Sequence, residues 1–411
     1  MSDDKGGIMK KITGTILTLA LTAGLTYAFP AREIFQAGAE STLVYETVNS
    51  KEKRGVDLQI RAKSAYAMDF GTGTVIYSQN ANARLPIASM CKIMTLILCF
   101  DAIDNGIVQM DEEITVSERA SSMGGSQVFL EANAKYPVRE LIKSIVVCSA
   151  NDSCVAMAEK IAGNESAFVD LMNDKAKELS ANDTLFSNCT GLPKDPQYSC
   201  AKDVAVMLQE LLKHREYYEF GKVWTDKFQH PKGRVTEITN TNKLVRFYEG
   251  CDGGKTGFTN QAGFCLAATA KRNDMRIVSV VIGEESSANR FEDIRSMFDY
   301  AFANYTVKPI VKEGERLQTC AFVNGGKQKE LEVYPQRSAY AFIKRGDKET
   351  TKTETVFDEL RAPIKAGERV GEIIVYTNNV ETERIPLLAT CDIEKASVFD
   401  RFKDIAKGWN G

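Results

Sequence analysis

The sequence predicts an α+β protein in which one antiparallel sheet is flanked by helices and is followed by a small all-β domain. The elements come in the order strand pair, helices, strands, helix, which is typical of one sheet with a helical subdomain inserted into it. From residue 307 the pattern changes to short alternating strands with turn signals between them. The 411 residues suffice for two or three domains, and a net charge of −3 gives no indication of nucleic-acid binding.

The N-terminal segment has the layout of a secretory signal. Lys10 and Lys11 precede an apolar stretch over residues 12–26, and Thr26-Tyr27-Ala28 stands at its end as the expected cleavage site. We expect a signal peptide over residues 1–28 and therefore an exported protein. The alternative is an uncleaved anchor, although the stretch is shorter than the ~20 apolar residues that span a bilayer. Residues 29–57 are polar and mixed, and we expect them to form a linker.

Residues 58–305 contain the elements expected to build the sheet and its helices. Two short strands on either side of a glycine turn at residues 71–73 predict a β-hairpin. Later strands rich in Val, Ile and Ala are expected over residues 264–270 and 276–283. The expected helices carry apolar residues at helical spacing and cover residues 87–100, 138–148, 152–162, 165–180, 201–213 and 290–304.

The C-terminal part predicts a separate β-rich domain and an amphipathic tail. Residues 306–390 form the expected domain, in which no catalytic cluster is visible. In the tail, residues 391–411, apolar side chains such as Phe402 and Trp409 fall on one helical face and charged side chains on the other. This pattern predicts peripheral contact with a membrane surface, and the alternative is a terminal helix packed on its own protein.

Ser89 and Lys92 are the first candidates for chemistry. They stand at the start of an apolar stretch, residues 87–100, and residues three apart lie on the same face of a helix. A serine hydroxyl needs a base beside it to act as a nucleophile. A lysine can be that base where burial or neighbouring cations lower its pKa. Alone, Ser-x-x-Lys is a weak signal that a polar first helical turn also explains.

Two further motifs strengthen this interpretation. Ser149 and Asn151 lie between two expected helices, where simple helix capping is the alternative explanation. Lys255, Thr256 and Gly257 lie at the start of the strand-rich region. The three motifs follow one another along the chain at residues 89–92, 149–151 and 255–257, and we expect them to form one site.

Other catalytic classes are disfavoured by residue counts. The chain has two histidines, His214 and His230, and neither lies in a serine-elbow context or in a zinc-ligand pair. Of its ten cysteines, several lie in apolar helical stretches, and no Cys-x-x-Cys pair occurs. We therefore expect mostly free thiols rather than disulfides, no bound metal and no cofactor.

The residues assign roles to the three motifs. Ser89 attacks a carbonyl and forms an acyl-enzyme, Lys92 accepts its proton, Ser149 relays a proton to the leaving amine, and Asn151 orients Lys92 and the substrate amide. Backbone N–H groups of Ser89 and Phe258 are expected to form the oxyanion hole.

The third motif is expected to bind substrate. Lys255 and Thr256 attract and hold a substrate carboxylate, and Gly257 lets the substrate backbone lie close to the strand.

Ser-x-x-Lys, Ser-x-Asn and Lys-Thr-Gly in this order are the signature of β-lactamases and penicillin-binding proteins. With the flanking residues 84–92, 149–158 and 252–259, the chain resembles the low-molecular-mass penicillin-binding proteins that are D-alanyl-D-alanine carboxypeptidases. The resemblance covers residues 58–305 most strongly and implies the penicillin-binding/β-lactamase-like transpeptidase fold. It further implies removal of the terminal D-alanine from peptidoglycan stem pentapeptides, inhibition by β-lactams, and a location at the extracytoplasmic face of the bacterial cell membrane or in the cell wall.

The resemblance also concerns single positions. Arg290 matches an arginine that the family uses for the substrate carboxylate. Cys91 stands where threonine is usual in the family, and Thr190 stands where histidine is common. Two alternatives remain: a β-lactamase, for which no Glu-x-x-Leu-Asn loop is evident, and a non-catalytic penicillin-binding sensor of the cell wall, which would not need intact Ser89 and Lys92.

Overall fold

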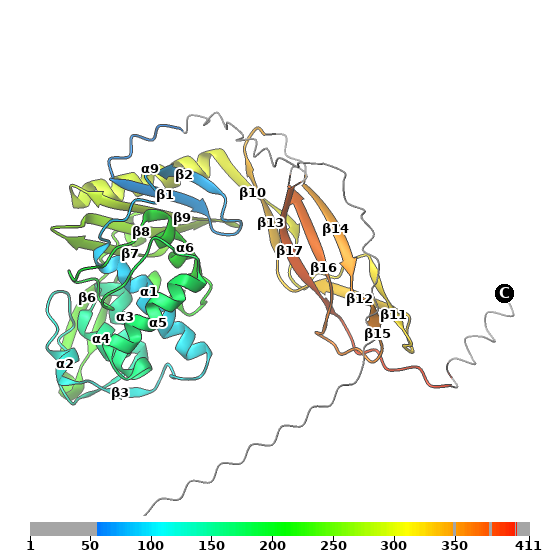
Figure 1. The fold of residues 1–411 in the computed structure, drawn as a ribbon, viewed down its shortest axis with the longest axis horizontal. Helices are drawn as coiled ribbons and strands as arrows, with labels where there is room; N and C mark the ends of the chain where they lie inside the picture. The colour runs from blue at the N-terminus through cyan, green and yellow to red at the C-terminus, as the bar shows by residue number, and fades with distance from the viewer. Residues whose placement is uncertain (1–55, 348–350, 378–379, 399, 401–411) are drawn as a thin grey trace, which may run out of the picture. The chain divides into compact units, whose positions relative to one another are not determined.

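The central sheet of the catalytic part contains five antiparallel strands. The computed structural model describes residues 56–347, 351–377, 380–398 and 400 (Figure 1). The strands are β1 (Ser64–Asp69), β2 (Val75–Gln79), β7 (Cys251–Thr259), β8 (Gly263–Arg272) and β9 (Met275–Glu284), in the spatial order β2-β1-β9-β8-β7. The predicted hairpin and the two predicted later strands are therefore confirmed. β7 is an edge of this sheet within the described residues.

Helices cover both faces of the sheet, so its strands are buried on two sides. Helix α9 (Ser287–Asn304) packs on β8 and β9, and its apolar side chains share a core with one face of the strands. The opposite face packs against the short 3₁₀ helix η1 (Ala88–Cys91), α1 (Lys92–Asp104) and α6 (Ala201–Leu211) (Figure 1). All six residues of β1 are buried, as expected of a strand between two helical layers.

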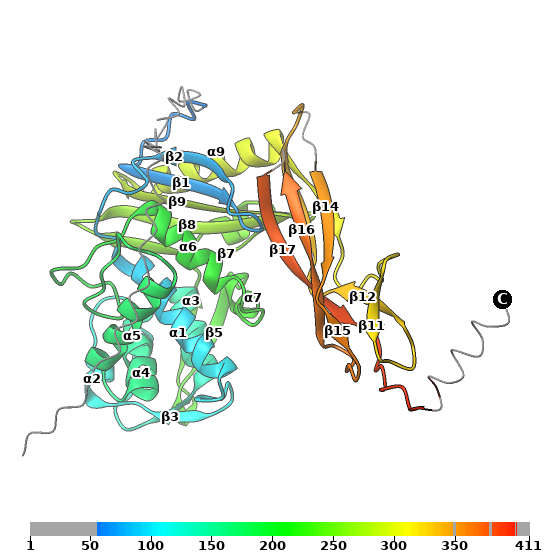
Figure 2. The same cartoon turned by 45° about the vertical axis from the view of Figure 1, so that its right-hand side comes forward.

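The helical subdomain lies between β2 and β7 in the sequence. Its helices are α2 (Glu118–Ser121), α3 (Val138–Cys148), α4 (Asn151–Ala162), α5 (Glu165–Glu178), α7 (Tyr217–Gly221) and α8 (Leu244–Phe247). Two antiparallel ribbons accompany them, β3 (Glu113–Thr115) with β4 (Lys135–Pro137) and β5 (Thr225–Gln229) with β6 (Val235–Thr239) (Figure 2). Ser117 and Asn164 cap α2 and α5 through side-chain oxygens that accept backbone N–H groups.

The C-terminal part is all-β, as predicted. A six-stranded sheet has the order β14-β16-β17-β12-β11-β15, and β10 pairs with β13. The strands are β10 (Tyr305–Val311), β11 (Cys320–Asn324), β12 (Glu330–Pro335), β13 (Ala339–Lys344), β14 (Thr351–Phe357), β15 (Leu360–Arg361), β16 (Arg369–Thr377) and β17 (Val380–Ala389). Alternating buried positions such as Leu331 and Val333 build its own apolar core.

Some sequence predictions fall outside the described residues. These are the signal peptide, nearly all of the linker, and the membrane-contacting face of the tail from residue 401. Among the helices that the structure describes, none combines the length and the apolar character that a bilayer crossing requires.

Candidate active site

Ser89 lies in a 3₁₀ turn and not in the α-helix that the sequence predicted over residues 87–100. Ala88 adopts a left-handed backbone conformation with φ of 48°, so a regular helix cannot run through it. The turn η1 follows, and α1 begins at Lys92. Because a 3₁₀ helix has three residues per turn, Ser89 and Lys92 still point the same way. The Nζ atom of Lys92 is hydrogen-bonded to Ser89 Oγ at 3.0 Å.

Lys92 has a second hydrogen-bond partner, which sequence reasoning missed. Its Nζ atom donates to the backbone carbonyl of Thr190 at 2.5 Å, and the lysine side chain is fully buried. The sequence marks Thr190 only as a departure from a common histidine. A contact made by a backbone carbonyl leaves no signal in residue type, so only the folded loop reveals it.

The second motif sits at the junction of α3 and α4, as predicted. Ser149 ends α3 in the left-handed conformation with φ of 66°, and its Oγ accepts a hydrogen bond from Lys255 Nζ at 2.8 Å. The residue before α4, Ala150, makes no side-chain cap, so helix capping does not account for the motif.

Asn151 is tied to the neighbouring loop. Its Nδ2 donates to the carbonyl of Gly124 at 2.7 Å. Its Oδ1 is buried and has no hydrogen-bond partner in the part of the chain that the structure describes. The expected contact between Asn151 and Lys92 is not among the described hydrogen bonds, and the open Oδ1 acceptor remains available to a bound amide N–H.

Lys255 brings a second buried cation to the site. It lies on β7, is 2% exposed, and donates to Ser149 Oγ and, at 3.1 Å, to the carbonyl of Thr256. Burial holds the pKa of Lys255 well below its ordinary value, and the positive charge of nearby Lys92 lowers it further. The two lysines therefore repel each other in a site that already disfavours charge.

Gly257 has a packing function that differs from the predicted one. A Cβ atom at this position would lie 2.5 Å from the Ile87 carbonyl oxygen and 3.2 Å from Ala88 Cβ. Glycine therefore lets β7 pack directly on the turn that carries Ser89.

Thr256 and Phe258 offer a ligand a hydroxyl group and an exposed aromatic ring at the third motif. The Thr256 hydroxyl donates to Thr241 Oγ1 at 2.8 Å, which places two hydroxyl groups side by side. Phe258 is 50% exposed and stacks on Phe264, with 4.3 Å between the ring centroids. An exposed aromatic ring next to the motif offers an apolar surface to a ligand.

Arg290 lies on α9, and its described hydrogen bonds go to the backbone of the sheet. Its Nη1 donates to the carbonyls of Gly257 at 3.3 Å and Cys265 at 3.5 Å, and the residue is 8% exposed. Burial lowers the pKa of Arg290 to about 10. The family resemblance implies that this arginine serves the substrate carboxylate, and in the structure it places a positive charge behind the Lys-Thr-Gly strand.

The cysteines are free thiols, as predicted. All ten lie within the described residues, and none forms a disulfide. Burial raises the pKa of Cys91 and of Cys154 to about 12, so both are held as protonated thiols at neutral pH. Within the described residues, no group of three or more His, Cys, Asp or Glu side chains is arranged to hold a metal ion.

Comparisons with known proteins agree with this arrangement. Residues 47–286 match the D-alanyl-D-alanine carboxypeptidase family, and residues 305–395 match the C-terminal domain of penicillin-binding protein 5. The chain is 38% identical to the D-alanyl-D-alanine carboxypeptidase DacF of Bacillus subtilis over 359 residues, which cover 87% of this chain and 92% of the relative. It is 30% identical to DacA of Escherichia coli, covering 85% and 88%.

Solved structures show the same fold. The peptidoglycan synthesis regulatory factor PBP3 of Streptococcus pneumoniae is 28% identical, with a TM-score of 0.69 over 82% of this chain and all of that one. Penicillin-binding protein 5 of Haemophilus influenzae is 26% identical, with a TM-score of 0.65 over 82% and 98%. The chain therefore belongs to the D-alanyl-D-alanine carboxypeptidase family, the low-molecular-mass penicillin-binding proteins, and is a serine carboxypeptidase of peptidoglycan metabolism.

Proposed function

We propose that Ser89 is the nucleophile that removes the terminal D-alanine from peptidoglycan stem pentapeptides. The observation that supports this most directly is the 3.0 Å hydrogen bond between Nζ of the fully buried Lys92 and Ser89 Oγ. Lys92 takes the serine proton as Oγ attacks the carbonyl of the penultimate D-alanine. The bond from that carbonyl carbon to the terminal amine then breaks, which leaves an acyl-enzyme that water hydrolyses.

The leaving amine needs a proton, and Ser149 is the proposed donor. Its hydroxyl is held by Lys255 and can pass a proton to the departing D-alanine while Lys255 replaces it. Asn151 holds the substrate amide through its open Oδ1. Backbone N–H groups of Ser89 and Phe258 stabilise the oxyanion, at ~3 kcal/mol per donor.

The terminal carboxylate of the substrate is the group that the third motif recognises. Lys255 supplies charge and Thr256 a hydroxyl donor at the edge strand, while Arg290 adds positive potential from behind it. β-Lactams carry a carboxylate and a reactive amide, so they acylate the same serine. No cofactor or nucleic acid enters this proposal.

The two terminal segments support a proposal for the location of the enzyme. We propose that residues 1–28 direct export, that residues 29–57 link them to the catalytic domain, and that the enzyme works at the extracytoplasmic face of the membrane or in the cell wall. Residues 58–305 form the proposed catalytic domain and residues 306–390 the β-rich domain. Residues 391–411 would give peripheral membrane contact.

The test is release of D-alanine from diacetyl-Lys-D-Ala-D-Ala by the mature protein and by its Ser89→Ala variant. We expect release by the first and none by the second, with slow turnover of penicillin. Rapid penicillin hydrolysis without D-alanine release would indicate a β-lactamase instead. Stable penicillin labelling with no turnover of either compound would indicate a sensor.

A further inference from the structure

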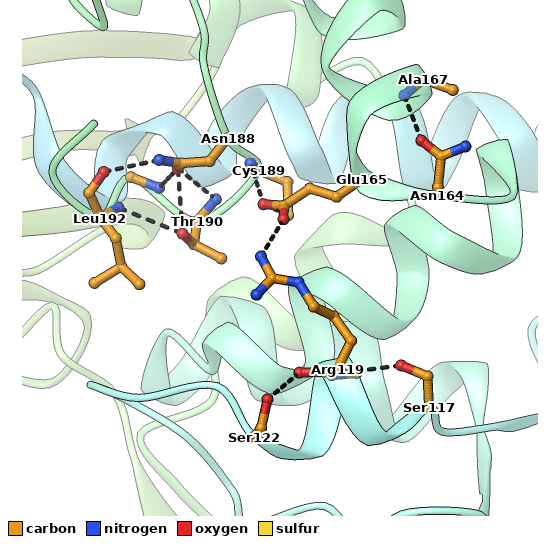
Figure 3. Close-up of polar contacts among 12 residues, drawn as sticks. Ser117, Arg119, Ser122, Asn164, Glu165, Ala167, Asn188, Cys189, Thr190 and Leu192 are labelled. Carbon is orange, nitrogen blue, oxygen red and sulfur yellow. Dashed lines mark hydrogen bonds and ion pairs between the residues drawn. The ribbon is translucent and has the colours of Figure 1, made fainter. Parts of the chain in front are cut away.

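The loop of residues 188–192 is organised around one buried side chain, Asn188. Its Oδ1 accepts hydrogen bonds from the backbone N–H of Gly191 at 2.7 Å and of Thr190 at 3.1 Å, and from the Thr190 hydroxyl at 3.2 Å (Figure 3). Its Nδ2 donates to the Leu192 carbonyl at 2.8 Å. Asn188 is 6% exposed, so these bonds form away from water, where they are strongest.

These bonds determine the direction of the Thr190 carbonyl. The N–H of Gly191 and the C=O of Thr190 belong to the same peptide unit, which is planar and trans, so they point in opposite directions. Because Asn188 Oδ1 holds this N–H, the carbonyl is turned away from Asn188. It is this carbonyl that accepts the hydrogen bond from Lys92 Nζ at 2.5 Å.

The loop is also pressed against the turn that carries the nucleophile. Gly191 has φ of 80°, and a Cβ on it would lie 2.1 Å from the Ala88 carbonyl oxygen and 2.9 Å from Ser89 N. The Cys91 thiol donates to the Asn188 carbonyl at 3.2 Å, and the Thr95 hydroxyl donates to the Cys189 carbonyl at 2.7 Å. The loop is therefore packed closely against the turn and the first part of α1.

A charged pair holds the loop from the side of the helical subdomain. Arg119 on α2 donates to Glu165 Oε2 at 2.8 Å, and the other oxygen of Glu165 accepts from the Cys189 backbone N–H at 3.5 Å (Figure 3). Glu165 thus connects α2 and α5 to the residue next to Thr190.

We propose that Asn188 is a positioning residue that orients the base through the Thr190 carbonyl. This rests on the proposed function of Lys92. A lysine amine at the end of a four-carbon chain can rotate about several bonds, and one hydrogen bond to Ser89 does not fix it. A second acceptor in a fixed direction leaves the remaining face of Nζ aimed at Ser89 Oγ. The proton taken from Ser89 then enters an already oriented nitrogen, and no reorganisation is needed during the reaction.

The test compares three variants in the full mature chain. Asn188→Leu keeps the branched shape and the number of side-chain heavy atoms and removes all four side-chain hydrogen bonds. Asn188→Asp keeps the acceptor for the Thr190 and Gly191 N–H groups but loses the donor to Leu192. Ser187→Ala is the matched control, because Ser187 directly precedes this loop and its hydroxyl donates to the Pro196 carbonyl in an exposed position. Active sites are counted with labelled penicillin, so that kcat is expressed per competent enzyme.

We expect kcat of Asn188→Leu to fall about 10–100-fold with KM nearly unchanged, since displacements near 1 Å cost about that much. Asn188→Asp should recover most of the loss, and Ser187→Ala should match wild type. Wild-type kcat per site in Asn188→Leu, or a loss in Asn188→Asp as large as in Asn188→Leu, would overturn the proposal. Should Asn188→Leu fail to fold, Asn188→Ala carries the same expectation.

The outcome is separable from that of the proposed function. If the wild-type chain releases D-alanine while Asn188→Leu keeps full kcat, only the role of Asn188 is refuted. If the wild-type chain releases none, the proposed function fails before the variants are considered.

Discussion

Replacing Gly257 by alanine tests whether the contact between β7 and the nucleophile turn sets the catalytic geometry. The added Cβ would lie 2.5 Å from the Ile87 carbonyl oxygen, which is 3.0 − 2.5 = 0.5 Å inside the closest approach that real Cβ atoms make. The obstructing atom belongs to the backbone, so it cannot rotate away. Strand and turn must separate by at least that amount, which moves Lys255 away from Ser89.

The expected effect is larger on catalysis than on folding. Overpacking of this kind costs about 1–3 kcal/mol of the free energy of unfolding. A misplacement of 0.5–1 Å in the site lowers kcat about 10–100-fold. We would measure kcat by D-alanine release, penicillin acylation by labelling, and the free energy of unfolding by urea titration.

Gly71→Ala is the control for this variant. A Cβ at Gly71 would meet only Asp69 Oδ2, at an ordinary 3.4 Å, in the turn between β1 and β2. It should keep both kcat and stability near wild type. A folded Gly257→Ala protein with wild-type kcat and wild-type penicillin acylation would refute the reasoning, because the geometry of the site would then not depend on this contact.

Three further predictions concern stability and thiol chemistry. Asp152 is fully buried and its carboxylate accepts three backbone N–H groups, so Asp152→Ala should lower the free energy of unfolding by about 3 kcal/mol in urea titrations, and an unchanged value would contradict this. Burial and the neighbouring Asp293 carboxylate raise the pKa of Glu284 from 4.5 to about 8, so the folded state holds a proton that the unfolded state has lost at neutral pH. Stability should therefore fall as pH rises from about 4.5 through 8, and Glu284→Gln should remove this decline; a decline that persists in the variant would assign it to other groups. In the native protein an alkylating reagent should modify Cys320 and Cys391 first, since both are exposed, and all ten thiols should react after denaturation; a free-thiol count near zero would show disulfides instead.

The local pattern of residues predicted the fold well, and the three motifs that it marked lie close together in the structure. The helix over residues 138–148 agrees with α3 at both ends, because a clear apolar stripe precedes the left-handed Ser149. The prediction of a continuous helix over residues 87–100 was wrong, because a local backbone conformation interrupts it. Ser89 lies in a 3₁₀ turn because Ala88 has a positive φ, and an alanine in the sequence gives no indication of that conformation.

Two further features could not be predicted from local sequence: the contact between Lys92 and the Thr190 carbonyl, and the surroundings of Arg290. Thr190 acts through its carbonyl, whose direction depends on Asn188 and not on its own side chain. Arg290 lies behind the strand because α9 packs on the face of the sheet opposite to η1 and α1, an arrangement that depends on strand order and not on local spacing. The residue types of a candidate site can be recognised in a sequence, whereas the backbone groups that orient their side chains are identified only in the folded structure.

The order β2-β1-β9-β8-β7 also dictates how this domain can form. Residues 64–69 pair with residues 277–282, so more than 200 positions of chain must be synthesised before β1 finds its partner β9. Closing so large a loop costs conformational entropy, and this cost is offset only when the complete sheet packs between its two helical layers. The consecutive helices α3, α4 and α5 contact one another over short separations and can pack together earlier. Because β7, β8 and β9 pair as consecutive hairpins, the pairing of β9 with β1 also brings β7 to the turn that carries Ser89. A chain that ends before β9 therefore holds the nucleophile but has no completed sheet to present a substrate to it.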